Sequence, residues 1–327
     1  MKERLTISIA MTTYNGERFL KEQLDSFLWQ TRLPDELVVC DDGSTDRTLE
    51  ILENFARTAP FPVKIFRNPQ RLGFSKNFEK ASLMCSGDLV AFSDQDDIWL
   101  PEKLEVVENI FRTDDEIGLL IHNLELVDNY NIKIIHKNML KLKKLNNYKN
   151  NIYLYCIKDQ NYNGNSIIVK SPLLEKIWPN PPFWTYDEWL LFSSLFFTKI
   201  LIINKILLKY RFHNQQTAFK MPISNYNLIK TYINKNNINI NMQNLYRKRI
   251  LKWKSFLICF KINLDKNIIN DIKTKIKLMK NNIYNHGPYK IFNIFYYYLL
   301  GYYNKYELGF RSMVRDLLIN FATFLSS

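Results

Sequence analysis

Hydrophobic and polar positions follow two different rhythms along the first part of the chain. Four short segments in which apolar residues alternate with polar ones or run together predict strands: 5–11, 37–40, 63–66 and 89–92. Four segments whose apolar residues recur every three or four positions predict helices: 20–28, 44–56, 78–85 and 101–112. Because strands alternate with helices, we predict an α/β fold with a mostly parallel sheet flanked by helices.

The pattern is less regular farther along the chain. The Asn- and Lys-rich stretch 129–163 predicts a long loop or insertion, either mobile or folded over a site. Strand-like patterns return at 165–171 and 206–213, and a helix is expected to begin near Tyr186. The last third of the chain is mostly helical and aromatic in character, and no repeat is visible in it.

Charge is distributed unevenly between the two ends. Residues 1–130 carry 14 basic and 24 acidic side chains, a net charge of −10, whereas the remainder carries +23. We therefore expect two domains, 1–215 and a basic, mostly helical region over 216–327. A basic surface of this size suits nucleic acid, an anionic membrane or a phosphorylated substrate. The Lys, Asn and Ile mixture at 230–244 is also what an AT-rich genome produces, so both interpretations stay open.

Cysteine spacing and apolar stretches exclude several classes of protein. The chain has four widely separated cysteines and no CxxC pair: Cys40, Cys85, Cys156 and Cys259. This argues against a disulfide framework and a zinc site, and a reducing cytoplasm fits best. The N-terminal apolar stretch is too short for a signal peptide, and the longest stretches, 190–203 and 291–303, fall short of the ~18–20 residues that span a bilayer. We expect a cytoplasmic protein without a transmembrane helix.

Two acidic clusters follow predicted strands. Asp41 and Asp42 end the second strand, and Asp94, Asp96 and Asp97 come directly after the fourth. Two carboxylates about 4 Å apart repel by roughly 4 kcal/mol near a protein surface, so a cation or a hydrogen-bonding ligand must offset the crowding. Because ligands of such sheets bind beyond the carboxyl ends of the strands, both clusters are expected to face one crevice.

Six motifs occur in a characteristic order: TTYNG (12–16), DDGSTD (41–46), NPQRLGFSKNFEKA (68–81), SDQDDIWLP (93–101), YDEW (186–189) and YRFH (210–213). This order resembles the family-two glycosyltransferases of GT-A fold, and within them the rhamnosyltransferase-like enzymes of bacterial surface polysaccharide synthesis. The first four motifs carry most of the resemblance, and the last two extend it to about residue 215. The resemblance implies a GT-A nucleotide-sugar-binding fold with a C-terminal helical extension.

The resemblance also implies that a nucleotide-sugar donor lies across the sheet. It assigns the nucleotide to six residues: Thr12, Thr13 and Tyr14 in the pocket wall, Asp42 with Asp41 beside it at the base, and Asp94 at the ribose. Asp-Gly favours turns, so the alternative to nucleotide binding is that Asp42 and Asp46 are turn and cap residues of "DDGSTD".

A divalent cation is expected beside the donor diphosphate. Asp96 matches the metal-binding carboxylate of the family's DxD motif, and Mg²⁺ or Mn²⁺ prefers carboxylate and phosphate oxygens. Asp97 either joins it or hydrogen-bonds locally. The sequence has no GxxxxGK[ST] loop, so phosphate charge must be met by the metal or by cationic residues: Arg71, Lys76, Arg211 and His213. His213 is a candidate phosphate or metal ligand, although a lone histidine is commonly structural.

Asp187 aligns with the family's catalytic aspartate. A carboxylate that takes the acceptor's proton as general base supplies ~10² to 10⁴-fold, and the expected course is a single displacement with inversion. Tyr186 replaces a histidine that often precedes this aspartate, which leaves base strength and acceptor choice open, and Glu188 is a lesser candidate. Alternatively, Asp187 is only the N-cap of the helix that follows.

These inferences predict an inverting, metal-dependent glycosyltransferase. Its donor would be dTDP-rhamnose or a UDP-hexose, and its acceptor a saccharide hydroxyl, expected to be lipid-linked, at the cytoplasmic face of the membrane. The basic C-terminal region could lie on anionic lipid as a peripheral anchor. One alternative is a sugar-nucleotide binder without catalysis. Nucleic-acid binding through the basic region is disfavoured because that region lacks a recognition signature and the acidic half would repel phosphates, so no nucleic-acid partner is expected.

Overall fold

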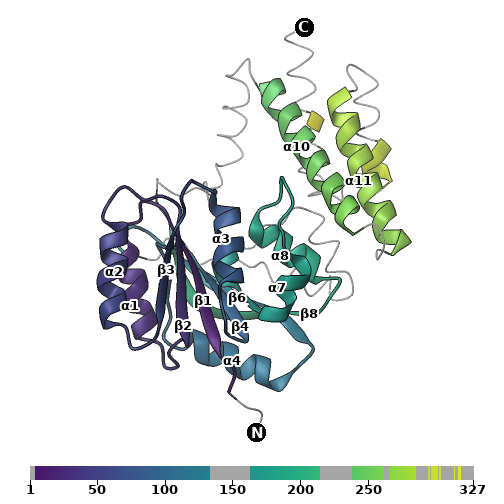
Figure 1. The fold of residues 1–327 in the computed structure, drawn as a ribbon. Helices are drawn as coiled ribbons and strands as arrows, with labels where there is room; N and C mark the ends of the chain where they lie inside the picture. The colour runs from purple at the N-terminus through teal and green to yellow at the C-terminus, as the bar shows by residue number, and fades with distance from the viewer. Residues whose placement is uncertain are drawn as a thin grey trace. The chain divides into compact units, whose positions relative to one another are not determined.

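The computed structural model (Figure 1) describes residues 4–132, 163–213, 238–260 and 265–284, and a few positions between 294 and 317. The described residues belong to two compact units. The first holds three segments: 4–132, 163–180 and 185–213. The second holds the short segment 181–184 and the described residues from 238 onward. The predicted insertion at 129–163 lies almost wholly outside the described residues.

The first unit is built on an eight-stranded sheet in the order β3-β2-β1-β4-β7-β6-β8-β5. The strands are β1 Ile7–Thr13, β2 Glu36–Asp41, β3 Val63–Arg67, β4 Leu89–Ser93, β5 Ile98–Trp99, β6 Ile117–Val127, β7 Ile167–Lys170 and β8 Lys199–Arg211. The first four strands of the sheet order are parallel to one another, and β6 is parallel to β8. β7 runs antiparallel to β4 and β6, and β5 antiparallel to β8. The α/β prediction is confirmed.

Helices connect and cover these strands. In the first unit they are α1 Leu20–Leu28, α2 Thr48–Thr58, α3 Phe74–Leu83, α4 Lys103–Thr113, the 3₁₀ turn η2 Gly164–Ser166, α7 Ser171–Ile177 and α8 Tyr186–Ser194. Every residue of β1, β2 and β4 is buried, so these strands are covered on both faces, as is typical of parallel sheets. Leu20, Leu24 and Phe27 form the buried stripe of α1 that their helical spacing predicts.

Three elements differ from the sequence prediction. The helix expected from Ser44 begins at Thr48 instead, because the Ser44 hydroxyl bonds Asp41 while Asp46 accepts from the backbone and side chain of Thr48. β6 is an apolar run without alternation and was not predicted. The strand expected at 206–213 is the end of a longer strand, β8, which begins before it and stops before His213.

The second unit contains two long helices, α10 Ile238–Cys259 and α11 Lys266–Tyr284, which pack against each other. Trp253, Phe256, Ile272 and Met279 are buried on them. The helical character expected for this region is therefore present where it is described. The division at residue 215 stays a prediction, because 214–237 lie outside the described residues. No described helix combines the length and apolar character required to cross a membrane.

Candidate active site

The carboxyl edge of the sheet gathers both acidic clusters. β1 pairs with β2 so that Thr13 lies opposite Asp41, and it pairs with β4 so that Met11 lies opposite Ser93. All three strands are parallel, so the loops that follow them leave the sheet at one edge. Asp42 and Asp94 therefore lie at the same edge, as predicted for a shared crevice.

A cavity of about 420 Å³ opens at this edge beside β2. Its lining residues are Tyr14, Asp42, Gly43, Arg67, Asn68, Pro69, Gln70 and Arg71. Three of the predicted donor-binding residues, Tyr14, Asp42 and Arg71, are thus brought together around one space. Two of the motifs quoted above, DDGSTD and NPQRLG, supply most of its wall.

Asp42 holds the wall of this cavity in place. Its carboxylate accepts hydrogen bonds from the backbone N–H groups of Leu72 at 2.7 Å and Gly73 at 2.9 Å, and from the Asn68 side chain at 3.0 Å. Gly73 has φ of +80°, a conformation that favours glycine and lets its N–H face the carboxylate. A carboxylate accepts about four hydrogen bonds, so these three contacts leave acceptor capacity for a ligand.

Arg71 and Tyr14 form a stacked pair in the same wall. The Arg71 guanidinium lies 3.8 Å from the centre of the Tyr14 ring, and its Nε lies 3.9 Å from an oxygen of Asp42. The Tyr14 backbone is fixed by the Gln95 amide, which accepts from its N–H at 2.8 Å and donates to its carbonyl at 3.1 Å. Gln95 was missed in the sequence, although it lies inside the SDQDD motif. Planar groups such as these suit a flat base or a phosphate.

Asp41 and Thr13 shape the neighbouring turn rather than the cavity. Asp41 is fully buried and accepts hydrogen bonds from the backbone of Gly43 and Ser44 and from the Thr13 hydroxyl. This is the turn role that the Asp-Gly alternative assigns, carried by Asp41. Thr12 is largely buried at the end of β1. Nucleotide contacts of Thr12, Thr13 and Asp41 stay predictions.

Four carboxylates of the SDQDD loop and of α8 share an electrostatic environment. Burial and the charges of Asp96 and Asp187 raise the pKa of Asp94 to about 8. Burial raises the pKa of Asp187 to about 6. Burial and the charges of Asp96 and Asp94 likewise raise the pKa of Asp97. Because the charge of Asp187 acts on Asp94, the SDQDD loop and the first turn of α8 lie near each other, as the catalytic hypothesis needs.

Asp187 lies in the first turn of α8 without capping it. Thr185 is the N-cap and forms a capping box with Glu188, so the alternative that Asp187 caps this helix is wrong. Asp187 is half-buried, and one of its oxygens accepts from the Glu188 N–H at 2.9 Å. Tyr186 points into the core and stacks on Phe78 with ring centres 4.1 Å apart. Tyr186 therefore packs in the core beside Asp187, and the effect of a tyrosine in place of the histidine on base strength stays a prediction.

Asp96 meets His213 directly. The His213 Nε2 lies 2.8 Å from a carboxylate oxygen of Asp96, and the imidazole packs on Phe19 with ring centres 4.9 Å apart. The two predicted metal ligands, far apart in the chain, are thus neighbours. Among the described residues, no group of three or more His, Cys, Asp or Glu side chains is placed to hold a metal ion. A pair completed by phosphate oxygens and water is nonetheless how Mg²⁺ is commonly held beside a nucleotide.

Arg211 supports the loop that carries Asp96. Its fully buried guanidinium donates to the Asp96 carbonyl at 3.0 Å and to the Asn129 carbonyl at 3.1 Å, and it is paired with Glu22. Lys76 is similarly engaged, with Glu79 at 2.7 Å and the Asn180 carbonyl at 3.0 Å. The predicted phosphate contacts of Arg211 and Lys76 stay predictions.

Asp97 hydrogen-bonds locally, as one of the sequence alternatives states. It is fully buried and accepts from the Asn165 side chain and from the Arg211 backbone N–H. Lys103, also fully buried, donates to the Asn165 carbonyl at 2.9 Å and lies 3.5 Å from the centre of the Trp99 ring. Burial lowers the pKa of Lys103, against the opposing effect of Asp97 and Asp94.

The sequence reasoning missed Lys103 and Asn165. For Lys103 a signal existed, because Val107 and Phe111 follow it at intervals of four and share the buried face of α4. A lysine at a core position is unusual and needs a partner of opposite charge. Asn165 carries no comparable signal, since its partners come from distant parts of the chain.

Comparisons with known proteins agree with this geometry. The family model for glycosyl transferase family 2 matches residues 8–173, about half of the chain. An uncharacterised glycosyltransferase of Nostoc sp. is 31% identical over 64% of this chain and 65% of its own length. A glucosyltransferase of Escherichia coli, named as UDP-Glc:α-D-GlcNAc-diphosphoundecaprenol β-1,3-glucosyltransferase, is 32% identical over 41% of this chain and 55% of its own length. The chain thus matches less than two thirds of either relative.

A further relative and two solved structures extend the comparison. A dTDP-rhamnosyl transferase of Shigella flexneri is 37% identical over 29% of this chain and 34% of its own length. S. aureus TarS in complex with UDP-GlcNAc has a TM-score of 0.55 at 19% identity, with coverage of 92% of this chain and 89% of TarS. A mannosyltransferase of Pyrobaculum calidifontis in complex with GDP-Man and Mn²⁺ has a TM-score of 0.52 at 16% identity, with coverage of 99% and 87%.

The similarity to TarS, a glycosyltransferase of GT-A fold, establishes a GT-A fold for this chain. The sequence relatives and the family model identify the lineage, and the matched region holds the four leading motifs at one edge of the sheet. The chain belongs to glycosyltransferase family 2.

Proposed function

We propose that this protein is an inverting, metal-dependent glycosyltransferase that moves a sugar from a nucleotide-sugar to a hydroxyl of a saccharide acceptor. The observation that carries the proposal is that the charge of Asp187 acts on Asp94 of the SDQDD loop, whose Gln95 holds the backbone of Tyr14 in the wall of the cavity at Asp42. A carboxylate whose pKa is raised to about 6 is suited to general-base work near neutral pH.

The donor is proposed to bind with its nucleotide in the cavity of Asp42, Tyr14 and Arg71. The remaining acceptor capacity of Asp42 suits the N–H of a uracil or thymine base, and the Arg71–Tyr14 pair provides a flat, cationic wall. Of the relatives, one is named for dTDP-rhamnose and another for UDP-Glc. We therefore propose dTDP-rhamnose or a UDP-hexose as donor.

Asp96 and His213 are proposed to hold Mg²⁺ or Mn²⁺ against the donor diphosphate. An oxygen and an imidazole nitrogen in direct contact are a donor set that such an ion accepts, and two protein ligands leave room for phosphate oxygens. When bound, the ion would stabilise the charge of the departing nucleoside diphosphate. Arg211 donates to the Asp96 carbonyl and so helps to hold the backbone of that proposed ligand in place.

Asp187 is proposed to take the proton of the acceptor hydroxyl. As it does so, the hydroxyl oxygen bonds the anomeric carbon while the bond from that carbon to the diphosphate oxygen breaks on the opposite face, which inverts the configuration. The Escherichia coli relative is named for an acceptor on a diphosphoundecaprenol lipid. We propose a lipid-linked saccharide as acceptor, reached from the cytoplasmic face of the membrane.

A donor screen tests the proposal. The purified chain is incubated with dTDP-rhamnose and a set of UDP-hexoses, with manganese or with a chelator, and nucleoside diphosphate release is measured. We expect release from one donor that is lost in chelator and restored by manganese, and lost in Asp96→Asn. Asp88→Asn, which changes a carboxylate at the opposite edge of the sheet, is the matched control. Equal release rates with chelator and with manganese would contradict the proposed metal dependence. Release from none of the donors would contradict the proposed transferase activity.

A further inference from the structure

The outward side of α10 carries apolar residues that the fold does not use. Tyr246, Ile250 and Trp253 are buried on the inner side of this helix. Leu251 and Ile258 face outward instead, with 45% and 76% of their surfaces exposed. They are seven residues apart, two helical turns, and so lie on the same side. A helix that packs on one side only is expected to be polar on the other, so these two side chains need another explanation.

Cationic residues surround the two apolar ones. Arg247, Lys248 and Lys254 are exposed, and each lies three or four positions from Leu251, on the same or an adjacent part of the helix surface. The outward side of α10 is therefore apolar at its centre and positively charged at its margins.

α11 adds a row of lysines. Lys266, Lys273, Lys277 and Lys280 are all exposed, and their spacing of seven, four and three places them on one side of the helix. The row is about 21 Å long, at 1.5 Å per residue. α10 and α11 lie side by side (Figure 1). In the described part of this unit from residue 238 on, Asp265 is the one exposed acidic residue, since Asp271 and Asp316 are buried.

We propose that the outward side of α10, formed by Arg247, Lys248, Leu251, Lys254 and Ile258, docks on an anionic lipid bilayer, and that the lysine row of the neighbouring α11 adds positive charge close to it. The cationic residues of α10 would lie at the headgroups while Leu251 and Ile258 enter the boundary with the acyl chains. Two separate contributions, charge and apolar insertion, are what stable peripheral anchoring requires. A soluble polyanion or a nucleic acid would use the lysines but would gain nothing from exposed aliphatic side chains.

The inference deepens the proposed function, on which its purpose rests, by naming the surface that brings the chain to a lipid-linked acceptor. It does not depend on the catalytic residues. Vesicle binding and donor turnover can therefore be measured separately in the same preparation.

The test is sedimentation of the full chain with vesicles of phosphatidylcholine alone and with vesicles that also contain phosphatidylglycerol. We expect binding to the anionic vesicles only, weakened by salt. Since each lysine or arginine near such a surface contributes about fivefold, Arg247→Gln with Lys248→Gln and Lys254→Gln should weaken partitioning roughly 100-fold. The matched control is a triple change of exposed lysines in the first unit: Lys21→Gln, Lys176→Gln and Lys205→Gln. It should leave partitioning unchanged.

A second variant separates lipid from other anions. Leu251→Ser with Ile258→Ser should reduce vesicle binding and leave binding to heparin unchanged, and circular dichroism confirms that the helices persist. Equal binding to both vesicle types, or equal loss in the control triple variant, would overturn the proposal. Heparin binding that matches vesicle binding, with no effect of the serine changes, would assign the surface to a soluble polyanion instead. Vesicle binding by a chain that hydrolyses no donor would contradict the proposed function and leave this inference intact.

Discussion

Two acidic side chains at the carboxyl edge of the large sheet, Asp94 and Asp187, differ in their pKa shifts from Glu36 at the amino edge. At the carboxyl edge, burial and neighbouring negative charges raise the pKa of Asp94 to about 8 and burial raises that of Asp187 to about 6. At the amino edge, burial opposes ionisation of Glu36, but hydrogen bonds from Lys64, Ser8 and Ser86 outweigh it and lower the pKa to about 2. The ionised forms of Asp94 and Asp187 are thus destabilised, whereas the ionised form of Glu36 is stabilised.

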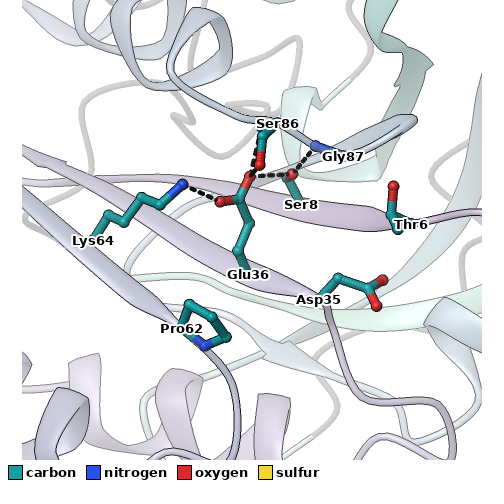
Figure 2. A pocket seen from close by; sticks show the side chains of 8 residues that line it. All are labelled: Thr6, Ser8, Asp35, Glu36, Pro62, Lys64, Ser86 and Gly87. Atoms are coloured by element: carbon teal, nitrogen blue, oxygen red, sulfur yellow. Dashed lines mark hydrogen bonds and ion pairs between the residues drawn. The ribbon is translucent and has the colours of Figure 1, made fainter.

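Glu36 shows how the amino edge achieves this. Its carboxylate lies 2.6 Å from the Lys64 ammonium, and it accepts from the Ser8 hydroxyl and the Ser86 N–H, each at 2.6 Å (Figure 2). These groups come from β1, β2, β3 and the turn before β4, so the contacts join four consecutive parts of the sheet. The cavity of about 250 Å³ that they line is a structural recess, with its carboxylate already occupied.

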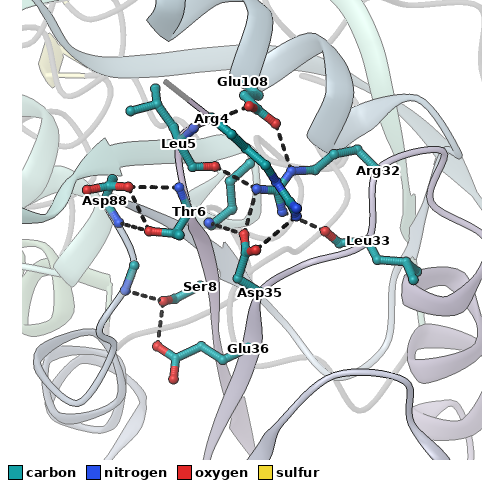
Figure 3. Close-up of polar contacts among 12 residues, drawn as sticks. Arg4, Leu5, Thr6, Ser8, Arg32, Leu33, Asp35, Glu36, Asp88 and Glu108 are labelled. Atoms are coloured by element: carbon teal, nitrogen blue, oxygen red, sulfur yellow. Dashed lines mark hydrogen bonds and ion pairs between the residues drawn. The ribbon is translucent and has the colours of Figure 1, made fainter. Parts of the chain in front are cut away.

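Neighbouring carboxylates at the amino edge are paired in the same manner (Figure 3). Arg32 bonds Glu108 at 2.8 Å and also pairs with Asp35, which accepts from the Ile7 N–H. Asp88 accepts from both the N–H and the hydroxyl of Thr6, which lowers its pKa. The comparison teaches that an acidic residue at a strand end indicates a ligand site only where its own chain does not satisfy it.

The largest expected effect is that of Asp187→Asn. If Asp187 is the base, the amide cannot take the proton and turnover should fall by about 10² to 10⁴-fold. Donor affinity, measured by calorimetry, should be unchanged. Glu188→Gln is the control, because glutamine can keep the capping box with Thr185, so helix stability and turnover should both stay nearly unchanged. Full turnover in Asp187→Asn would remove the base assignment and favour a binder without catalysis.

Next in size is the loss of stability expected for Glu36→Gln. A pKa lowered from 4.5 to about 2 corresponds to about 2–3 kcal/mol of folding free energy at neutral pH, after allowance for the partly exposed Lys64. Because the folded-state pKa is the lower one, this stability is present above pH 4.5 and is lost as the pH falls towards 2. Denaturant unfolding of both proteins at several pH values should show the difference shrinking in acid, while donor affinity at neutral pH stays the same.

A smaller effect is expected for Asp42→Asn. The asparagine amide has one acceptor oxygen instead of two. It therefore cannot accept from the Leu72 and Gly73 N–H groups and also from the uracil or thymine base of the nucleotide-sugar. Hydrogen bonds to a charged group are worth about 1.5–3 kcal/mol, so donor affinity should fall about tenfold or more. Calorimetry with UDP and dTDP measures it. Asp46→Asn is the comparison at the neighbouring turn, and an equal loss there would assign the effect to loop structure.

The first half of the sheet could be predicted from the sequence because each strand and helix there has a clear hydrophobic periodicity of its own. Strands and helices alternate from β1 to α4, and the acidic clusters follow their strands directly. β6 was missed because a buried strand in a mixed sheet reads as an apolar run, which periodicity cannot separate from helix. The start of β8 is only partly buried and continues the apolar stretch 190–203, in which no alternation marks where the strand begins.

Side-chain partnerships were harder to predict than elements. Glu36 stands directly before the predicted strand 37–40, and a charged residue at that point is expected at the surface, yet its partners on β1 and β3 bury it. Arg211 was predicted to face a phosphate, whereas its structural contacts are carbonyl groups and Glu22. In each case the partners are distant in sequence, so local pattern carries no information about them.

The smallest expected effect concerns pH. Asp187 must be ionised to accept a proton, so kcat/KM for transfer should fall tenfold per pH unit below about 6, the value to which burial raises its pKa. Loss of folding should not account for this fall in rate. The pKa of Glu36 is about 2, so Glu36 stays ionised and keeps its contribution to stability over the pH range in which Asp187 titrates. Unfolding curves at pH 5 and 7 provide the control. In Asp187→Asn the residual rate should lose this acid limb, and a limb that persists unchanged would assign the ionisation to another group.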